Sequence, residues 1–272
     1  MKTEPADIMV VTGDNLSSLA ISDLRDAKAL LENPGLAARI SNFMGSPLEA
    51  GLNNLPVAWH EKITTTVQKS IEIALDVALL TMDRDGSEPP ANRWHIFAAG
   101  VVGAVGGIFG LPALALELPV STTIILRSIA DIARSEGEDL RLPDAKLQCL
   151  QVLALGWKSN GADGVETGYF AVRTALASAV SEAVSHLAQN GLSREGAPAI
   201  VKLITQVAAR FSIAVSEKAV TQAVPVVGAL GGSAINTLFI DHFQDMGRGH
   251  FIVRRLERLY GWEEVRRVYE EL

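Results

Sequence analysis

The feature that most constrains this chain is an apolar, glycine-rich segment that occurs twice. Residues 101–107 read VVGAVGG and residues 226–232 read VVGALGG, so six of the seven positions are identical. Each copy lies in a long run without a charged residue, at 96–116 and 219–240. A helix made from either run would be long enough to cross the hydrocarbon core of a bilayer, which is about 30 Å thick. Both runs must therefore be shielded from water, either by the rest of the protein or by lipid.

Glycines at helical spacing within the two runs predict close contact between helices. Glycine costs a helix about 0.5–1 kcal/mol relative to alanine, so this many glycines require a compensating gain. A spacing of four residues places small residues on one helix face, where they allow two backbones to approach each other. We therefore predict that the two segments are helical and packed together, through Gly103, Gly106, Gly107, Gly110, Gly228, Gly231 and Gly232.

Two interpretations of the apolar runs stay open at the level of sequence. In one, the runs are buried helices in the core of a soluble protein. In the other, the first run enters a membrane as a hairpin that turns at Gly110, Leu111 and Pro112, with arms over 96–109 and 113–126. An arm of 14 residues spans about 21 Å, which is too short to cross the bilayer but long enough to enter one leaflet.

Periodicity and stop signals predict helices along the rest of the chain. On a helix expected to start at Pro56, apolar residues recur every four positions, at Ile63, Val67, Ile71, Leu75 and Leu79. Proline and glycine delimit further helices, which we expect at 14–33, 36–44, 120–136, 143–156, 165–190, 198–223, 226–260 and 262–271. No stretch alternates with the period of a strand. The expected fold class is all-α, a multi-helix bundle that contains the two glycine-rich segments.

Composition excludes several classes of function. A net charge of -7 opposes nucleic-acid binding, which needs clustered basic residues. The single cysteine, Cys149, lies in an apolar run and is expected to be a buried, inert thiol. The acidic N-terminus lacks the basic start of a signal peptide, so a cytoplasmic location is expected. No phosphate-binding loop, dinucleotide fingerprint or nucleophile elbow is present, and we expect no cofactor.

Two blocks of sequence carry a resemblance to a known family. They are GGIFGLPALALELPVSTTIILRSIADIARSEGEDL at 106–140 and VPVVGALGGSAINTLFIDHFQDMGRGHFIVRRLERLYG at 224–261. In these blocks the chain resembles the EcsC family of bacterial proteins, over roughly residues 56–261. The resemblance implies a setting beside an ABC transporter, in the cytoplasm or at the inner face of the cell membrane, and it implies no agreed activity. It divides the chain into an N-terminal helical extension, 1–45, and an EcsC-like helical domain, 46–272.

Ionisable residues next to the apolar runs are the candidates for a site. Glu117 lies within ALALELPV. A carboxylate there must be paired, protonated or solvent-facing, because an isolated buried charge is too costly. Arg127 and Asp131 are four residues apart on one helix face and are placed to pair, and Arg248 is placed to pair with Asp241 or Asp245. These carboxylates and histidines lack the spacing of a metal site, so no metal is expected. The residues that would line a ligand pocket are Glu117, Arg127, Asp131, Asp241, His242, Arg248 and His250.

Three functions are compatible with these features. The leading hypothesis is an accessory, non-catalytic helical protein at the cytoplasmic membrane face that binds lipid, an apolar ligand or a membrane transporter. The alternative is a soluble enzyme, a hydrolase or a metal-dependent enzyme, with a buried polar pocket built from Glu117, Arg127, Asp131, Asp241 and His242. The third is a dimerising interaction module, in which the glycine faces pack between the chains of a homo-oligomer.

Overall fold

The computed structural model describes most of the chain outside its glycine-rich segments. The described residues are 16–32, 35–44, 57–82, 110–156, 168–190, 197–222 and 232–272. Within these ranges every regular element is an α-helix, which confirms the predicted all-α fold. Of the seven glycines predicted to mediate helix contact, Gly110 and Gly232 begin helices, and the other five lie outside the described residues.

The first two helices are close to their predicted positions. Helix α1 (Ser18–Glu32) begins after Ser17, whose Oγ accepts a hydrogen bond from the backbone N–H of Ala20 at 3.2 Å. Serine in this position supplies one of the acceptors that the first helical amides lack. Helix α1 buries the stripe Ala20, Leu24, Ala27 and Leu31. Helix α2 (Leu36–Met44) follows and buries Leu36 and Ile40.

Two long helices, α4 (Val57–Met82) and α6 (Gly110–Ser135), pack against each other. Of the predicted stripe on α4, Leu75 is buried and Ile63, Val67 and Ile71 are fully excluded from solvent. The side chain of Leu79 lies outside the part that the structure describes. The predicted turn at Gly110, Leu111 and Pro112 is wrong, because these residues form the first turn of α6.

The predicted start of α6 after Pro119 is also wrong, because Pro119 lies inside the helix. A proline at 112 is tolerated, since the first helical amides have no partner to lose. Proline within a helix usually costs about 3 kcal/mol. At Pro119 the packing of α6 against its neighbouring helices outweighs that cost. Helix α6 ends where predicted, at Gly137, whose φ of 80° is one that glycine adopts readily. The Glu138 N–H then donates to the Ala133 carbonyl at 2.9 Å.

The remaining helices lie at their predicted positions, but the predicted starts of two of them, at 165 and 226, lie outside the described residues. They are α7 (Pro143–Leu155), α8 (Tyr169–Asn190), α9 (Pro198–Gln222), α11 (Gly232–Tyr260) and α12 (Trp262–Glu271). The stretch Pro198–Thr221 of α9 is long and apolar enough to span a membrane, and half of its apolar window is buried within the protein. Among the described residues no other helix meets that criterion.

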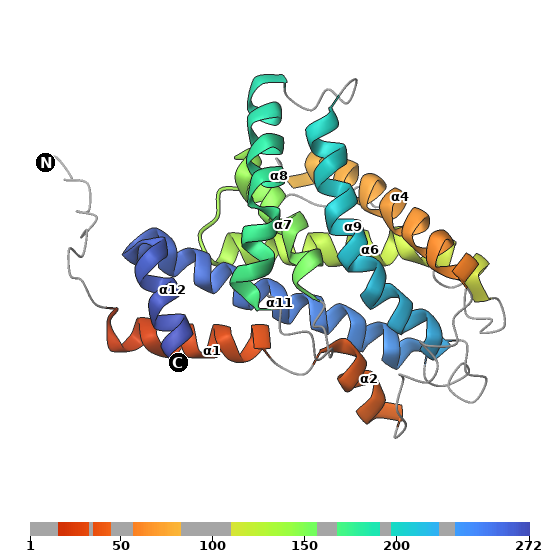
Figure 1. Ribbon diagram of the computed structural model, residues 1–272, viewed down its shortest axis with the longest axis horizontal. Coiled ribbons are helices and arrows are strands. Elements are labelled where there is room, and N and C mark those ends of the chain that lie inside the picture. The colour runs from red at the N-terminus through yellow and green to blue at the C-terminus, as the bar shows by residue number, and fades with distance from the viewer. Residues whose placement is uncertain are drawn as a thin grey trace, which may run out of the picture.

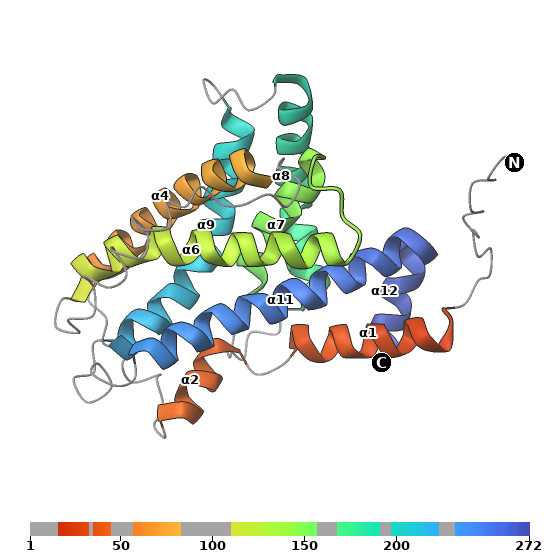
Figure 2. The same ribbon diagram turned by 180° about the vertical axis from the view of Figure 1, so that it is seen from behind.

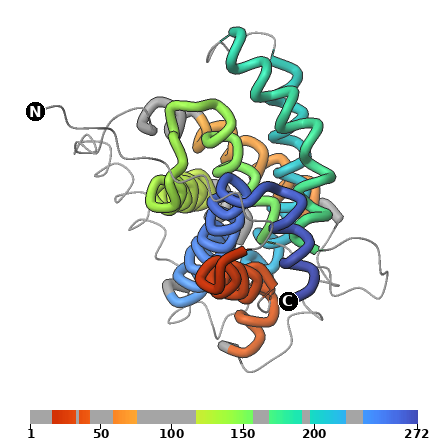
Figure 3. Tube along the Cα trace, turned by 90° about the vertical axis from the view of Figure 1, so that its left-hand side faces the viewer, coloured from red at the N-terminus to blue at the C-terminus, as the bar shows by residue number. Residues whose placement is uncertain are grey.

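Helix α11 is the centre of the bundle. It lies between α6 and α1, and these three helices form a row when the molecule is viewed along them (Figure 3). Glycines on α11 allow α1 and α6 to pack close to its backbone. A Cβ built on Gly249 would lie 2.6 Å from Leu31 Cγ, whereas one built on Gly247 would lie 3.4 Å from Ile129 Cγ1.

Four helix ends meet at one end of the molecule. Figures 1 and 2 both show the last turn of α9 beside the first turns of α4, α6 and α11. Residues 83–109 connect α4 to α6, and residues 223–231 connect α9 to α11. Both glycine-rich repeats are therefore joined to the bundle at this end, which we call the repeat end.

Candidate functional site

A buried ion pair lies beneath the repeat end. The Lys218 Nζ of α9 donates to Glu117 Oε1 of α6 at 2.6 Å and to Asn236 Oδ1 of α11 at 2.8 Å. The same ammonium lies over the Phe239 ring, 4.7 Å from its centroid. We call these four residues the Lys218 cluster. Three helices that are far apart in sequence are thus joined through one side chain.

The Lys218 cluster satisfies a charge that burial would otherwise make very costly. The Lys218 side chain has no exposed surface, whereas that of Glu117 is 18% exposed. Burial lowers the pKa of the Lys218 ammonium, and the carboxylate of Glu117 opposes that shift. An ammonium has three donors, and the carboxylate, the amide oxygen and the aromatic face surround it. The cluster therefore acts as a tie between helices rather than as a group open to a substrate.

The two charged members of the cluster mark the boundaries of the apolar runs. Glu117 is the first charged residue after the run 96–116, and Lys218 is the last charged residue before the run 219–240. The 2.6 Å contact between them therefore brings the end of one run beside the start of the other. Pairing was one of the three states predicted for Glu117, and the structure identifies its partner as Lys218.

The other predicted residues of α6 lie away from this cluster. Asp131 is exposed and pairs with Arg134, three residues later, at 2.6 Å, so the predicted pair with Arg127 is not the one it forms. Arg127 is half-buried on the same helix. Fourteen residues separate Glu117 from Asp131 on α6, which is about 21 Å along a helix.

The predicted residues of α11 serve mainly as structural contacts. His242 is buried, and its Nε2 lies 2.6 Å from the Gly156 carbonyl oxygen at the end of α7. Arg248 pairs with Asp245 at 3.0 Å, as one of the two predicted pairings proposed. Asp245 also accepts from Arg39 of α2 at 2.8 Å. Asp241, the other proposed partner, is exposed on α11.

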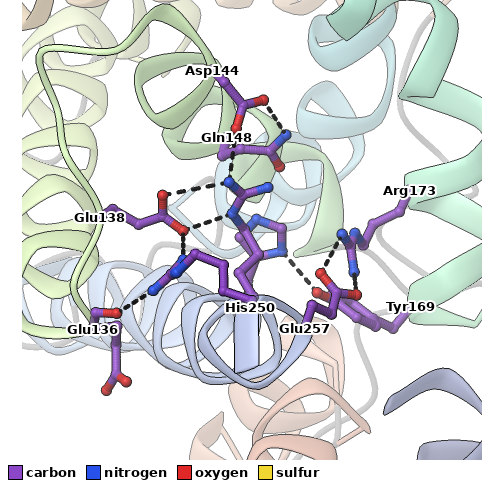
Figure 4. A network of polar contacts seen from close by, with 10 residues as sticks. Glu136, Glu138, Asp144, Gln148, Tyr169, Arg173, His250 and Glu257 are labelled. Atoms are coloured by element: carbon purple, nitrogen blue, oxygen red, sulfur yellow. Dashed lines mark hydrogen bonds and ion pairs between the residues drawn. The ribbon is translucent and has the colours of Figure 1, made fainter. Parts of the chain in front are cut away.

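His250 belongs to a second buried polar group, drawn in Figure 4. The Tyr169 hydroxyl of α8 lies 2.9 Å from His250 Nδ1 of α11. Arg173 lies over the Tyr169 ring and makes two hydrogen bonds, of 2.5 and 2.9 Å, to Glu257. Burial, and then the charges of Arg173 and Arg254, lower the pKa of His250 well below its ordinary value. His250 is therefore neutral at neutral pH and is poorly suited to act as a general base there.

The same polar group continues toward the end of α6. Arg254 donates to Glu138 at 2.8 Å and to Asp144 at 2.8 Å, and Gln148 donates to Asp144 at 3.2 Å. Arg258 also donates to Glu138. These contacts join α11 to Glu138 in the α6–α7 connection and to Asp144 of α7 (Figure 4). Paired, charge-assisted bonds of this kind fix the angle between helices.

The seven predicted residues do not converge on one pocket. Glu117 lies in the Lys218 cluster, His250 lies in the group of Figure 4, and Asp131, Asp241 and Arg248 are exposed. Within the described ranges, His, Cys, Asp and Glu residues form no group of three that could hold a metal ion. Cys149 is buried, as predicted, and burial raises the pKa of its thiol.

The sequence pointed to several residues of the two polar groups but not to the side chains that they contact. Lys218 and Tyr169 were not among the candidates, although they contact Glu117 and His250. Arg173 and Glu138, which pair with Glu257 and Arg254, were also missed. One signal was present for Lys218, because it is the charged residue that borders the second apolar run. The others lie on helices whose relative placement no local pattern reveals.

The architecture defines an all-α protein built around a central helix, with two related apolar repeats attached at one end. Comparison with known families agrees with the resemblance described above. The chain belongs to the EcsC protein family, which it matches over residues 19–256. None of the curated proteins or solved structures compared with the chain matches it. The family match includes α1 and α2, which the sequence resemblance left out.

Proposed function

We propose that this protein is an accessory protein of the cytoplasmic membrane face, and that it docks on the lipid surface through its repeat end. The observation that carries the proposal is the Glu117–Lys218 ion pair, 2.6 Å long, which brings the boundaries of both apolar runs together. The runs 96–116 and 219–240 contain no charged residue. Two uncharged segments that meet at one place offer a larger apolar surface than either would alone.

The electrostatics of the repeat end favour contact with lipid. An isolated charge near hydrocarbon is expensive, whereas a paired and hydrogen-bonded charge costs much less. Lys218 and Glu117 compensate each other, and Asn236 accepts a further hydrogen bond from the ammonium. The end of the first run and the start of the second are thus bordered by charges that neutralise each other as a pair.

A membrane transporter is a second ligand for the same surface. An apolar surface that docks beside a bilayer also fits the membrane-embedded part of a transporter, which is the setting that the family resemblance implied. The enzyme hypothesis has less support, because the residues it requires do not converge within the described structure.

Co-sedimentation with lipid vesicles tests the proposal. Wild-type protein purified without detergent should pellet with vesicles of phosphatidylcholine and phosphatidylglycerol. The double variant Val102→Glu/Val227→Glu places a charge in each run and should stay in the supernatant, since a carboxylate costs about 2.5–3.5 kcal/mol at the centre of a bilayer. The matched control Val201→Glu, at an exposed position of α9 (52% exposed), should pellet like the wild type.

Two outcomes would contradict the proposal. One is a wild-type protein that stays in the supernatant with every vesicle composition. The other is a double variant that pellets as well as the control does. Thermal melts of all three proteins establish that the variants are folded. Binding of the wild type to membranes that contain its transporter, but not to pure lipid, would transfer the proposal to the transporter.

A further inference from the structure

A buried carboxyl group lies under the small helix α2. Glu217 of α9 is 7% exposed, and its carboxyl group accepts a hydrogen bond from the backbone N–H of Ala37. Ala37 is the second residue of α2. The first four amides of a helix have no acceptor within the helix, and capping side chains, water or the residues just before the helix satisfy them. Here α9 supplies the capping side chain, and Glu217 caps α2 from another part of the chain.

Few contacts hold α2 on the bundle. The helix contacts α9 and α11, and it lies beside the ends of those helices at the repeat end (Figures 1 and 2). It buries Leu36 and Ile40, and its Arg39 pairs with Asp245 of α11. The hydrogen bond from the Ala37 N–H to Glu217 adds a polar contact between α2 and α9.

Ionisation of Glu217 is unfavourable while α2 covers it. Burial raises the pKa of the carboxyl group to about 7, and the Ala37 N–H opposes that shift. The charged groups that neighbouring elements bring to this region have partners of their own or face solvent. Lys218 pairs with Glu117 of α6, Asp245 of α11 pairs with Arg39 and Arg248, and Asp241 of α11 is exposed.

We propose that Glu217 makes the docking of α2 depend on pH near neutrality. When α2 lifts away, water reaches the carboxyl group, and its pKa returns toward the ordinary value of 4.5. The docked state therefore binds the proton more tightly than the lifted state does. By linkage, docking is strongest below about pH 5 and weakens as the pH rises to about 7.

Lifting of α2 would uncover apolar surface at the repeat end. Leu36 and Ile40 are 1% and 0% exposed when α2 is docked, and they become available together with the part of α9 and α11 beneath them. A link between this event and lipid docking rests on the proposed function. The pH dependence of α2 itself does not, and it can be measured without lipid.

Hydrogen exchange of residues 35–44, read by mass spectrometry, tests the inference on the lipid-free protein. After correction for intrinsic exchange, the opening equilibrium of α2 should rise roughly tenfold or more between pH 5.5 and pH 7.5. Glu217→Gln keeps an acceptor for Ala37 but does not ionise, so its opening should be independent of pH. Glu182→Gln changes an exposed glutamate on α8 that pairs with Lys202, and it should keep the wild-type dependence.

A dependence on pH that persists in Glu217→Gln would overturn the inference, as would its absence from the wild type. A second measurement covers the case in which that variant folds poorly. Carbon-13 NMR of labelled glutamate carboxyl groups should show one group in the wild type that titrates near pH 7. If the carboxyl group assigned to Glu217 titrates near its ordinary value instead, the docking of α2 is not linked to its protonation. Vesicle co-sedimentation remains a separate test of the proposed function.

Discussion

Removing either partner of the Lys218–Glu117 pair should destabilise the protein strongly, and removing both should cost less than the sum. Lys218→Met leaves the Glu117 carboxylate without its ammonium, but that carboxylate is 18% exposed and can recruit water. Glu117→Gln leaves a fully buried ammonium with Asn236 and the Phe239 ring. Breaking one side of a buried pair typically costs about 3–5 kcal/mol. We expect the lysine variant near the lower figure and the glutamate variant near the upper one.

The double variant Lys218→Met/Glu117→Gln provides the decisive comparison. It leaves no unpaired charge, so its loss should fall short of the summed single losses by about 1–3 kcal/mol. Urea denaturation followed by circular dichroism measures all four proteins. For a chain of this size the single variants should also lower Tm by on the order of 10 °C. Additive losses, or single losses below about 1 kcal/mol, would refute the view that this pair joins α6 to α9.

Three further predictions concern packing, pH and the thiol. Gly249→Ala should lower stability by about 1–3 kcal/mol, because its Cβ would overlap neighbouring atoms of α1, whereas Gly247→Ala should be neutral or stabilising in the same thermal melts; equal effects would contradict this. In a Glu217→Gln background, stability should fall as pH drops below about 6.5, because the unfolded chain then protonates His250 while the folded chain holds it neutral; a flat urea-denaturation profile would contradict this. Cys149 should react with a thiol reagent only after unfolding, and fast labelling of the native protein would show that it is accessible.

Local sequence signals predicted most helix boundaries correctly, and the errors lie at prolines. Helix stops at Gly137 and Gly261 were correctly read, because both adopt a positive φ that glycine tolerates. Pro119 was misread as a helix start, since a proline is common there, but the packing of α6 against α4 and α11 carries the helix through it. Local preference thus predicts an element well only where tertiary contacts do not oppose it.

The candidate site was predictable in part. The cost of an isolated charge left Glu117 paired, protonated or exposed, and spacing offered Asp245 as one of two partners for Arg248; the structure shows both pairs. The identity of the partner Lys218 depends on how α6 and α9 are placed in space, which no spacing within either helix encodes. The same reason hid Tyr169 as the partner of His250.

The most direct test of the central claim asks whether both repeats meet lipid at the same time. Single cysteines at Gly103 and Gly228, in a Cys149→Ser background, would each carry an environment-sensitive fluorophore. A label on the exposed Ser178 of α8 serves as the control. We predict that anionic vesicles shift the emission of both repeat labels to shorter wavelength and leave the control unchanged. Emission that stays unchanged at both repeats, or that shifts at only one, would contradict docking through a shared repeat end.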